Sequence, residues 1–453
     1  MVPCTTHARD RCGPGWAEVT MTMALRLRAA FTRERLRKLS YAPVLALAMG
    51  LMLVRLLVMA RLLELPHFAI YSAGLLVSSS FCMLTCLGLQ SLLQRDLPVM
   101  IVRGRERAGG VLLAQCAGVA ILCAVTGAAV VTFSDLYLAG LTPSLLSLAL
   151  LHGLSQQLFL IATVDSRSRG LPHVFARHNL GRSLIVLGTA VAATLMGGQG
   201  ATALAVEALV SLAISAWLLS QQFHAIDLRL LVVLQVAQRR LLSVRWRSAL
   251  ALLSVASLGF VVINVDRWLA AQWLPAPNFA QYSFAWTLLM VAQSVQVVIN
   301  ASLYPMLAKR FASGDIEAAF RIGAVASLGL LIAGIVAALP LWALMDFAVA
   351  SWFTAYADAR DLLPVFLVVA VLRVSDFWTS FLLVAGREAW LLLLSLSSVT
   401  VAVVAWWLIV QPSHATLRIE QVALLALVLA VSGYGTVAVA AWRCARSLQS
   451  VGR

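Results

Sequence analysis

The chain contains the string Phe68-Ala69-Ile70-Tyr71-Ser72 and, 211 residues later, the near-copy Phe279-Ala280-Gln281-Tyr282-Ser283. Pro66 and Pro277 precede the two strings at the same offset. Both strings lie near the start of a long apolar segment, directly after a short polar turn. Because the match includes this shared position, it indicates a duplicated unit and not a chance repeat in an Ala/Leu-rich chain.

The composition places both copies of the string in a membrane. Of the 453 residues, 61% are hydrophobic and 12% are charged, and the mean hydropathy is +0.91. A water-soluble chain of this length has too little interior for so much apolar surface, whereas a bilayer accepts helices of about 20 apolar residues. Cutting the apolar runs at charges and at Pro/Gly clusters predicts twelve spans: residues 41–62, 68–92, 109–133, 142–164, 183–200, 202–223, 249–270, 279–303, 322–345, 362–384, 390–410 and 421–442.

The repeat divides these spans into two sets of six. Since six is an even number, both sets enter the membrane in one orientation and are related by an axis along the membrane normal. We therefore predict an all-α integral membrane protein with two pseudo-symmetric six-helix lobes, residues 41–223 and 249–442. A basic N-terminal segment (residues 1–40), an amphipathic linker (residues 224–248) and a C-terminal tail (residues 443–453) complete the predicted organisation, all on the cytoplasmic side.

The basic residues give the predicted orientation. With the N-terminus in the cytoplasm, 28 of the 34 Lys and Arg residues fall in cytoplasmic segments, as the positive-inside rule requires. Four fall on the periplasmic side, namely Arg61, Arg267, Arg360 and Arg418. Only two of the basic residues are lysine, which is typical of a GC-rich bacterial genome, so the predicted location is a bacterial inner membrane.

Ionisable residues within the predicted spans are the candidate functional residues. A charge near the bilayer centre costs about 2.5–3.5 kcal/mol on insertion scales, so each one needs a partner or a wet cavity. The candidates are Arg55, His152, Glu207, Asp266, Arg373 and Asp376. Arg55 and Asp266 are equivalent by the 211-residue offset and opposite in charge, so we expect them to face one another across a cavity between the lobes.

Structural interpretations stand beside the functional ones. Arg55 is either an anion-binding cation or part of a salt bridge that fixes helix packing. Arg373 and Asp376 are three residues apart, so they can neutralise each other on one helix face. Asp266 lies near the predicted interface beside Arg267, where both can reach water. His152 matches Arg373 only in a looser alignment of the two lobes.

The sequence lacks the residue patterns of metal sites, nucleic-acid-binding proteins, ATP-driven transporters and enzymes. Seven cysteines occur without CxxC or Cys/His ligand spacing, so we expect no metal, no disulfide and no cofactor. The basic residues lie in short segments and not on a water-facing domain, which argues against a nucleic-acid partner. No GxxxxGK[ST] loop is present, which argues against an ATP-driven mechanism. We do not expect an enzyme, because the longest predicted periplasmic segment, residues 346–361, is too short to hold a reaction centre.

Several short motifs resemble those of the polysaccharide flippases in the MATE-like exporter superfamily. They are Asp266-Arg267-Trp268 with Phe279-Ala280-Gln281-Tyr282, Tyr304-Pro305-Met306-Leu307-Ala308-Lys309 with Gly314-Asp315, and Gly88-Leu89-Gln90 with Arg95. The resemblance implies alternating access by two lobes around a cationic cavity. The implied cargo is an undecaprenyl-diphosphate-linked oligosaccharide repeat unit, moved from the cytoplasmic to the periplasmic leaflet for a surface polysaccharide such as O-antigen or exopolysaccharide.

The same resemblance assigns roles and partners. Arg55, Arg373 and His152 are the candidates for contacting the diphosphate or acidic sugars. Glu207, Asp266 and Asp376 are the candidates for coupling or charge pairing. The implied partners are the lipid-linked oligosaccharide, the membrane itself, and a polysaccharide polymerase and glycosyltransferases as neighbours.

Three alternatives remain at this stage. A MATE-type drug or cation exporter shares the expected fold, but it would be expected to carry acidic residues in a cavity without cations. A major-facilitator transporter normally has a Gly/Asp/Arg signature between its second and third helices, which residues 95–110 lack. A membrane glycosyltransferase or polymerase would need a larger periplasmic loop with carboxylates, Arg and His around the reaction centre.

Overall fold

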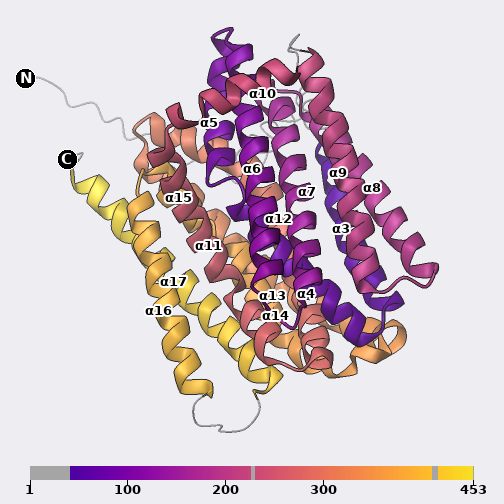
Figure 1. Cartoon of the computed structure of the whole chain (residues 1–453). Coiled ribbons are helices and arrows are strands. Elements are labelled where there is room, and N and C mark those ends of the chain that lie inside the picture. Colours follow the sequence, from indigo (N-terminus) through magenta and orange to yellow (C-terminus); the bar gives the residue numbers. More distant parts are fainter. Residues whose placement is uncertain (1–40, 226–229, 411–416, 452–453) are drawn as a thin grey trace, which may run out of the picture.

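The structure, a computed structural model, describes residues 41–225, 230–410 and 417–451 (Figure 1). The predicted basic segment, residues 1–40, lies outside these ranges. Nearly every described residue belongs to a helix, which agrees with the all-α prediction.

The helices follow one another in two series. The first series is α3 (Tyr41–Leu62), α4 (Leu65–Leu84), α5 (Leu89–Val102), α6 (Glu106–Phe133), α7 (Pro143–Ser168), α8 (Pro172–Leu195) and α9 (Gly200–Ala225). The predicted linker region contains α10 (Leu230–Arg239) and the 3-10 helix η1 (Leu241–Ser243). The second series is α11 (Trp246–Trp273), α12 (Ala276–Ala312), α13 (Ile316–Trp352), η2 (Thr354–Leu362), α14 (Leu363–Ser375), α15 (Trp378–Val384), α16 (Glu388–Val410) and α17 (Ile419–Val451).

Ten helical segments within the described ranges are long and apolar enough to cross a membrane. They match ten of the predicted spans. The helices α8 and α12 lie at the other two predicted positions. The count of twelve spans therefore stays a prediction, as does the orientation.

Two of the predicted spans are interrupted. Residues 68–92 do not form one helix, because α4 ends at Leu84 and α5 begins at Leu89. Gly88 lies in the turn between them with φ +82°, and a Cβ atom there would lie 1.9 Å from the carbonyl oxygen of Ala249 in α11. Only glycine fits this turn, since both its left-handed backbone and its contact with α11 exclude a side chain.

The second interruption falls in predicted span 362–384, where α14 ends at Ser375 and α15 begins at Trp378. The Asp376 carboxylate accepts hydrogen bonds from the Thr379 backbone N–H at 3.2 Å and from the Thr379 hydroxyl at 2.7 Å. An Asp side chain competes with the helix for nearby backbone groups and favours a new helix start. Asp376 thus lies at a helix break and not in mid-helix as predicted.

The helices pack mainly within their own series (Figure 1). In the first series, α7 contacts α4, α6 and α9, and α8 contacts α3 and α9. In the second, α14 contacts α12, α13 and α17, and α16 lies along α17. The two series meet where α12 contacts α3 and α4, and where α11 contacts α4 and α5. We call them the first and second helix groups below.

The largest hydrophobic core joins the two groups near the N-terminal ends of α4 and α12. The ring of Phe68 in α4 meets the ring of Tyr356 in η2 edge-on, with 5.6 Å between centroids. Tyr356 in turn stacks on Phe284 of α12 at 4.5 Å. Aromatic pairs of this kind stabilise a fold by more than the buried area alone would give. These rings fill the space between the two groups, so this end of the molecule is closed.

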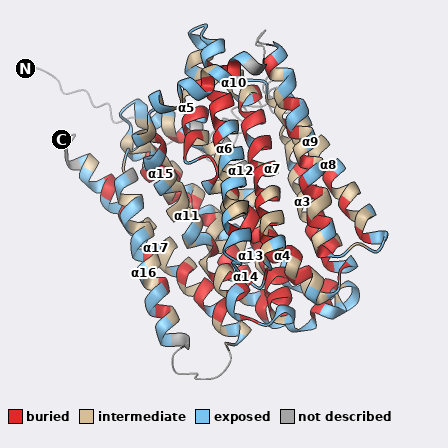
Figure 2. Cartoon of the chain, viewed as in Figure 1, coloured by how far each residue is buried: buried red, intermediate tan, exposed pale blue. Residues whose placement is uncertain are grey.

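Burial is concentrated in a few central helices (Figure 2). The helices α4 and α7 are the most buried of the ten candidate spans, and α11 and α13 are the least buried. The outward faces of the peripheral helices remain apolar, as in Leu393 and Val439, which is expected where lipid is the solvent.

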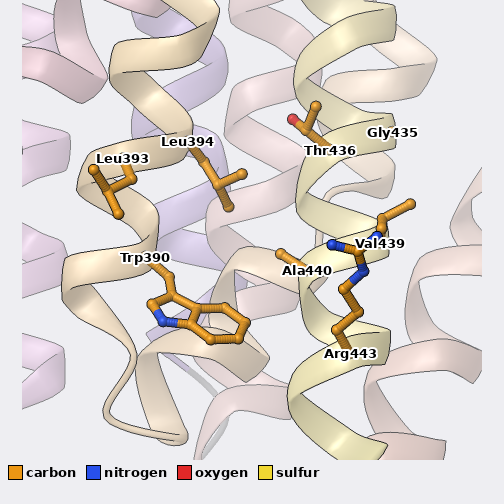
Figure 3. Close-up of a pocket in the computed structure, with 8 residues that line it drawn as sticks. All are labelled: Trp390, Leu393, Leu394, Gly435, Thr436, Val439, Ala440 and Arg443. Carbon is orange, nitrogen blue, oxygen red and sulfur yellow. The ribbon is translucent and has the colours of Figure 1, made fainter.

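A groove lies between α16 and α17 at the edge of the second group (Figure 3). Its volume is about 530 Å³, and it is lined by Trp390, Leu393, Leu394, Gly435, Thr436, Val439, Ala440 and Arg443. None of the predicted site residues lies in it.

Candidate functional site

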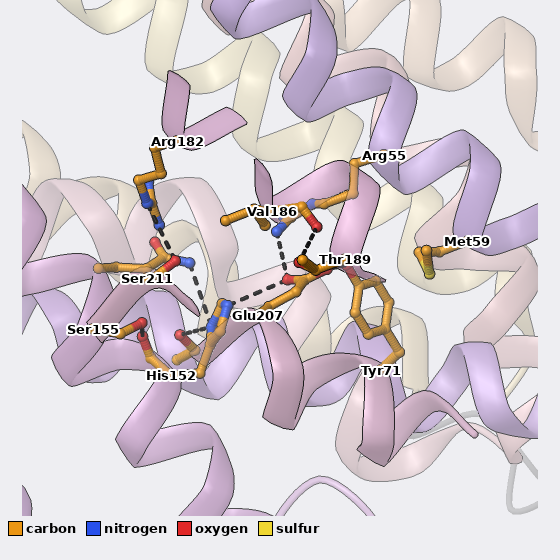
Figure 4. A network of polar contacts seen from close by, with 12 residues as sticks. Arg55, Met59, Tyr71, His152, Ser155, Arg182, Val186, Thr189, Glu207 and Ser211 are labelled. Carbon is orange, nitrogen blue, oxygen red and sulfur yellow. Dashed lines mark hydrogen bonds and ion pairs between the residues drawn. The ribbon is translucent and has the colours of Figure 1, made fainter. Parts of the chain in front are cut away.

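The predicted residues of the first helix group meet around one carboxylate, Glu207 of α9, which is fully buried. Arg55 of α3 donates from Nη1 to Glu207 Oε2 at 2.5 Å, and Tyr71 of α4 donates its hydroxyl to Oε1 at 2.7 Å. The His152 Nε2 atom of α7 lies 3.4 Å from Oε2. Figure 4 shows these side chains converging from four helices. We call this set the first polar cluster.

A close approach of α4 and α7 positions His152. The residue after it, Gly153, has no side chain, and a Cβ atom there would lie 2.6 Å from the Ser78 carbonyl oxygen. The absence of a Cβ therefore lets the two helices pack closely enough for Ser78 Oγ to lie 2.7 Å from His152 Nδ1. The contact at Nδ1 holds the imidazole with its Nε2 atom turned toward Glu207.

A second arginine belongs to this cluster. Arg182 of α8 donates from Nε to Ser211 Oγ at 3.3 Å, and its guanidinium lies 4.6 Å from the centre of the Phe159 ring. No carboxylate among the described residues lies within 4.0 Å of it, although its charge interacts with those of Arg55 and Glu207. The cluster thus combines two arginines with one carboxylate and has a positive excess.

The second helix group contains an equivalent arrangement, the second polar cluster. Asp266 of α11 is fully buried and accepts the Tyr282 hydroxyl of α12 at 2.6 Å. Arg373 of α14 donates to the Ile263 carbonyl at 3.1 Å, three residues before Asp266 in α11. The neighbouring Arg267 lies over the Trp286 ring at 4.5 Å. Here too, two arginines accompany one carboxylate.

Arg267 also links the two groups. Its Nη2 atom donates to the Ser72 carbonyl of α4 at 3.3 Å. One residue on, the Trp268 indole N–H donates to Ser80 Oγ of the same helix at 3.1 Å. The second polar cluster therefore lies against α4, the helix that also carries Tyr71 of the first cluster.

The repeat relates the two clusters through their tyrosines. Tyr71 and Tyr282 are equivalent by the 211-residue offset, and each donates its hydroxyl to a buried carboxylate. The carboxylates are not equivalent, because Glu207 comes from the last helix of the first group and Asp266 from the first helix of the second. The hydroxyl donor is thus equivalent in the two repeats, while the acceptor lies on a different helix in each.

Arg55 and Asp266, which were expected to face one another across a cavity between the lobes, each bind a partner in their own helix group. Arg55 is bound to Glu207 within its own group, and Asp266 accepts from Tyr282 within the other. Arg55 is only 7% exposed. These two residues were expected to meet because they are equivalent in the repeat, but each finds a closer partner inside its own helix group.

Two further expectations are corrected by the structure. Arg373 and Asp376 do not form an ion pair, because α14 ends between them and the Asp376 carboxylate binds Thr379. Asp266 and Arg267 do not reach water at the membrane surface. Their exposed fractions are 0% and 7%, so Arg267, which the orientation count placed in the periplasm, is buried in the protein.

Prediction from the sequence missed Tyr71 and Tyr282 as polar partners, although both lie inside the repeated string. It also missed Arg182, which was placed in a cytoplasmic segment because the span was predicted to begin at residue 183. The helix α8 in fact begins at Pro172, and proline is favoured in the first turn of a helix. Among the described residues, no group of three or more His, Cys, Asp or Glu side chains is arranged to hold a metal ion.

Comparison with known proteins shows that the fold is similar to that of several solved structures. No protein-family model matches the sequence, and no match was found among the curated proteins. A multidrug resistance MATE family transporter of the MOP superfamily, in an inward-facing conformation, gives a TM-score of 0.61 at 13% identity, over 90% of this chain and 96% of that chain.

Two further structures agree with this one. The eukaryotic MATE transporter AtDTX14 gives a TM-score of 0.60 at 12% identity, over 91% of this chain and 98% of that chain. A mutant of the Vibrio cholerae MATE transporter VcmN gives a TM-score of 0.58 at 14% identity, over 91% of this chain and 96% of that chain. At these identities the similarity concerns the fold, over nearly the full length of both chains. The chain therefore has the fold of the MATE transporters.

Proposed function

We propose that the chain is a transporter that moves an anionic, lipid-linked oligosaccharide from the cytoplasmic to the periplasmic leaflet of a bacterial inner membrane. The observation that carries this proposal is the positive excess of both polar clusters. Arg182 and Arg373 have no carboxylate within 4.0 Å among the described residues, whereas a transporter for cations would be expected to present acidic groups without such neighbours.

Spare hydrogen-bond donors support an anionic ligand. The Arg373 Nη1 and Arg267 Nε atoms are buried without a hydrogen-bond partner among the described residues. A buried charged donor without a partner is costly, so such groups call for a ligand or water. A guanidinium also matches the oxygens of a phosphate in pairs, and a diphosphate is the charged part of the proposed cargo.

The proposal gives the predicted residues different roles. Arg373 is the primary contact for the diphosphate, with Arg182 as the cation of the first cluster. Arg55 is neutralised by Glu207, so it becomes available to the cargo only when Glu207 is protonated or moves away. Glu207 and His152 are therefore the proposed coupling groups, and Asp266 holds Tyr282 and balances one arginine of the second cluster. Asp376 caps α15.

Alternating access requires that the two ends of the molecule open in turn. One end is closed by the aromatic contact of Phe68 with Tyr356. At the other end, Asp96 of α5 pairs with Arg245, one residue before α11. Exposed ion pairs of this kind contribute about 0–1 kcal/mol, so we propose that the Asp96 end is the one that opens to receive cargo.

A reversible cross-link tests whether the opposite end, closed by Phe68 and Tyr356, must open for transport. Phe68→Cys combined with Tyr356→Cys, joined by a bifunctional methanethiosulfonate reagent, should stop transport, and a thiol reductant should restore it. Each single variant, treated in the same way, is the control for modification of the native cysteines. Full transport by the cross-linked pair would contradict the proposed opening.

The cargo is tested by reconstitution. Proteoliposomes containing a fluorescent undecaprenyl-diphosphate oligosaccharide should show protein-dependent loss of fluorescence when a membrane-impermeant quencher reaches the opposite leaflet. Arg373→Ala should lower the initial rate at least tenfold, in keeping with a lost charge-assisted hydrogen bond. Arg360→Ala is the matched control, because Arg360 lies in the same helix group but is exposed and pairs with Asp346 at 2.6 Å. Equal rates for wild type and protein-free vesicles would refute the proposed cargo.

A second candidate function is export of drugs or organic cations, and the similarity in fold to a multidrug resistance MATE family transporter favours it. The same vesicles, loaded with a cationic dye in place of the lipid, discriminate the two. Dye movement that survives Arg373→Ala, without movement of the oligosaccharide lipid, would establish the exporter. The flippase proposal also implies glycosyltransferases that build the cargo before transport and a polysaccharide polymerase that uses it afterwards. The transporter itself carries out no reaction on the cargo.

A further inference from the structure

The groove between α16 and α17 is separate from both polar clusters. Both of its walls are candidate membrane spans, so its contents must come from within the bilayer. Most of its lining is apolar, and its volume of about 530 Å³ lies within the range of about 300–1,000 Å³ that is usual for ligand sites. Small residues in α17, Gly435 and Ala440, create this space opposite the side chains of α16.

The charge among the described residues that line the groove is positive. Arg443 is the only charged side chain in this set. In Figure 3 the Arg443 side chain runs back along α17 and faces the Trp390 ring on the opposite wall. A second cation is close by, because the Arg387 guanidinium lies 5.3 Å from the centre of the Trp390 ring. The antiparallel helices thus place two guanidinium groups and an indole at the same end of an apolar groove.

An anionic phospholipid has the matching distribution of properties. Its acyl chain is apolar and its phosphate is negative, and basic pockets between membrane helices bind such headgroups. Tryptophan favours the boundary between hydrocarbon and headgroups, which places Trp390 and Arg443 at the depth of a lipid phosphate. A zwitterionic lipid would fill the apolar part equally well but would gain less from the two arginines.

We propose that this groove is a binding site for an anionic glycerophospholipid, with one acyl chain along Leu393, Leu394 and Val439 and the phosphate at Arg443. The site goes beyond the proposed transport function and does not depend on it. It serves as a lipid site on the outer surface of the second helix group, distinct from the route of the cargo.

Native mass spectrometry of the purified full chain tests the site, because it resolves individual bound lipids. Phosphatidylglycerol and phosphatidylethanolamine with identical acyl chains are titrated separately. We expect the wild type to bind phosphatidylglycerol about tenfold more tightly, and Arg443→Gln to remove this preference. Arg446→Gln is the matched control, since Arg446 lies on the same helix but stacks on Trp442 outside the groove lining.

Filling the groove tests the acyl-chain part. A Cβ atom at Gly435 meets nothing within 4 Å, so Gly435→Phe can be accommodated and should occlude the groove, lowering the affinity for both lipids at least tenfold. Gly433→Phe is its control, because Gly433 is equally open and does not line the groove. Glycerol phosphate is added as a competitor, and it should not displace the lipid.

The outcomes separate the proposal from its rivals. Equal affinity for the two lipids in the wild type would overturn headgroup recognition. Equal losses in Arg443→Gln and Arg446→Gln would mean attraction to a basic surface and not to this groove. Unchanged binding in Gly435→Phe would overturn the position of the acyl chain, and displacement by glycerol phosphate would identify a site for free phosphate esters.

Discussion

Replacing Glu207 by glutamine tests whether an ion pair holds the first polar cluster together. Glutamine has nearly the same shape and can still accept the Tyr71 hydroxyl. It removes the negative charge that faces Arg55, and its amide N–H groups can point toward the guanidinium. Since Glu207 is fully buried and Arg55 is 7% exposed, water cannot replace the lost partner.

The expected cost follows from that burial. Removing one partner of a buried ion pair leaves an uncompensated charge and destabilises a protein by about 3–5 kcal/mol. This is a large part of the total stability of about 5–15 kcal/mol that folded proteins have. Adding Arg55→Met to Glu207→Gln removes the stranded charge, so the double variant should recover most of the loss.

Reversible unfolding in mixed micelles, followed while the denaturing detergent fraction is raised, gives the free energies of unfolding. Glu317→Gln is the control, because its 3.1 Å pair with Arg321 is exposed and should cost less than about 1 kcal/mol. A free energy of unfolding for Glu207→Gln within about 1 kcal/mol of wild type would contradict a stabilising ion pair. A double variant no more stable than the single one would also contradict it, since Arg55 would then have a partner other than Glu207.

Two further predictions concern the repeat and the turn after α4. Tyr71→Phe and Tyr282→Phe should each lower the free energy of unfolding by about 1.5–3 kcal/mol, because each removes a hydrogen bond to a charged group; a loss at only one of them would contradict their equivalence. Gly88→Ala should yield little folded protein in size-exclusion chromatography, because its Cβ atom would lie 1.9 Å from the Ala249 carbonyl oxygen. Gly104→Ala, also at positive φ but in open space, should cost only about 1–2 kcal/mol, and similar behaviour of the two variants would argue against the close contact with α11.

Hydropathy along the chain located the helices well. The first predicted span ends where α3 ends, at Leu62, and every other predicted span falls on a helix or on a pair of helices. This succeeds because insertion of a helix into a bilayer depends on the apolar length of one segment, which is a local property. The repeated string also identified the equivalence of Tyr71 and Tyr282, whose hydroxyl groups make equivalent hydrogen bonds.

Pairing of the intramembrane charges could not be predicted in this way. Arg55 and Glu207 are 152 residues apart in the sequence, and the residues around either one do not indicate the other as its partner. The equivalence of Arg55 and Asp266 instead suggested a contact that the packing does not make. The burial of Arg267 depends on the packing of α11 against α4. The helix break at Asp376 arises because the Asp376 carboxylate competes with the helix for the Thr379 backbone N–H.

The length of an apolar segment and the presence of an internal repeat are properties of the linear sequence. The amino-acid sequence alone was therefore enough to establish a polytopic helical membrane protein with equivalent helices in two series. The partners of its charged groups depend on which helix faces meet, and that is set by the shapes of many side chains at once. The same packing produced the groove between α16 and α17, which has no signature in the sequence because its lining comes from two different helices.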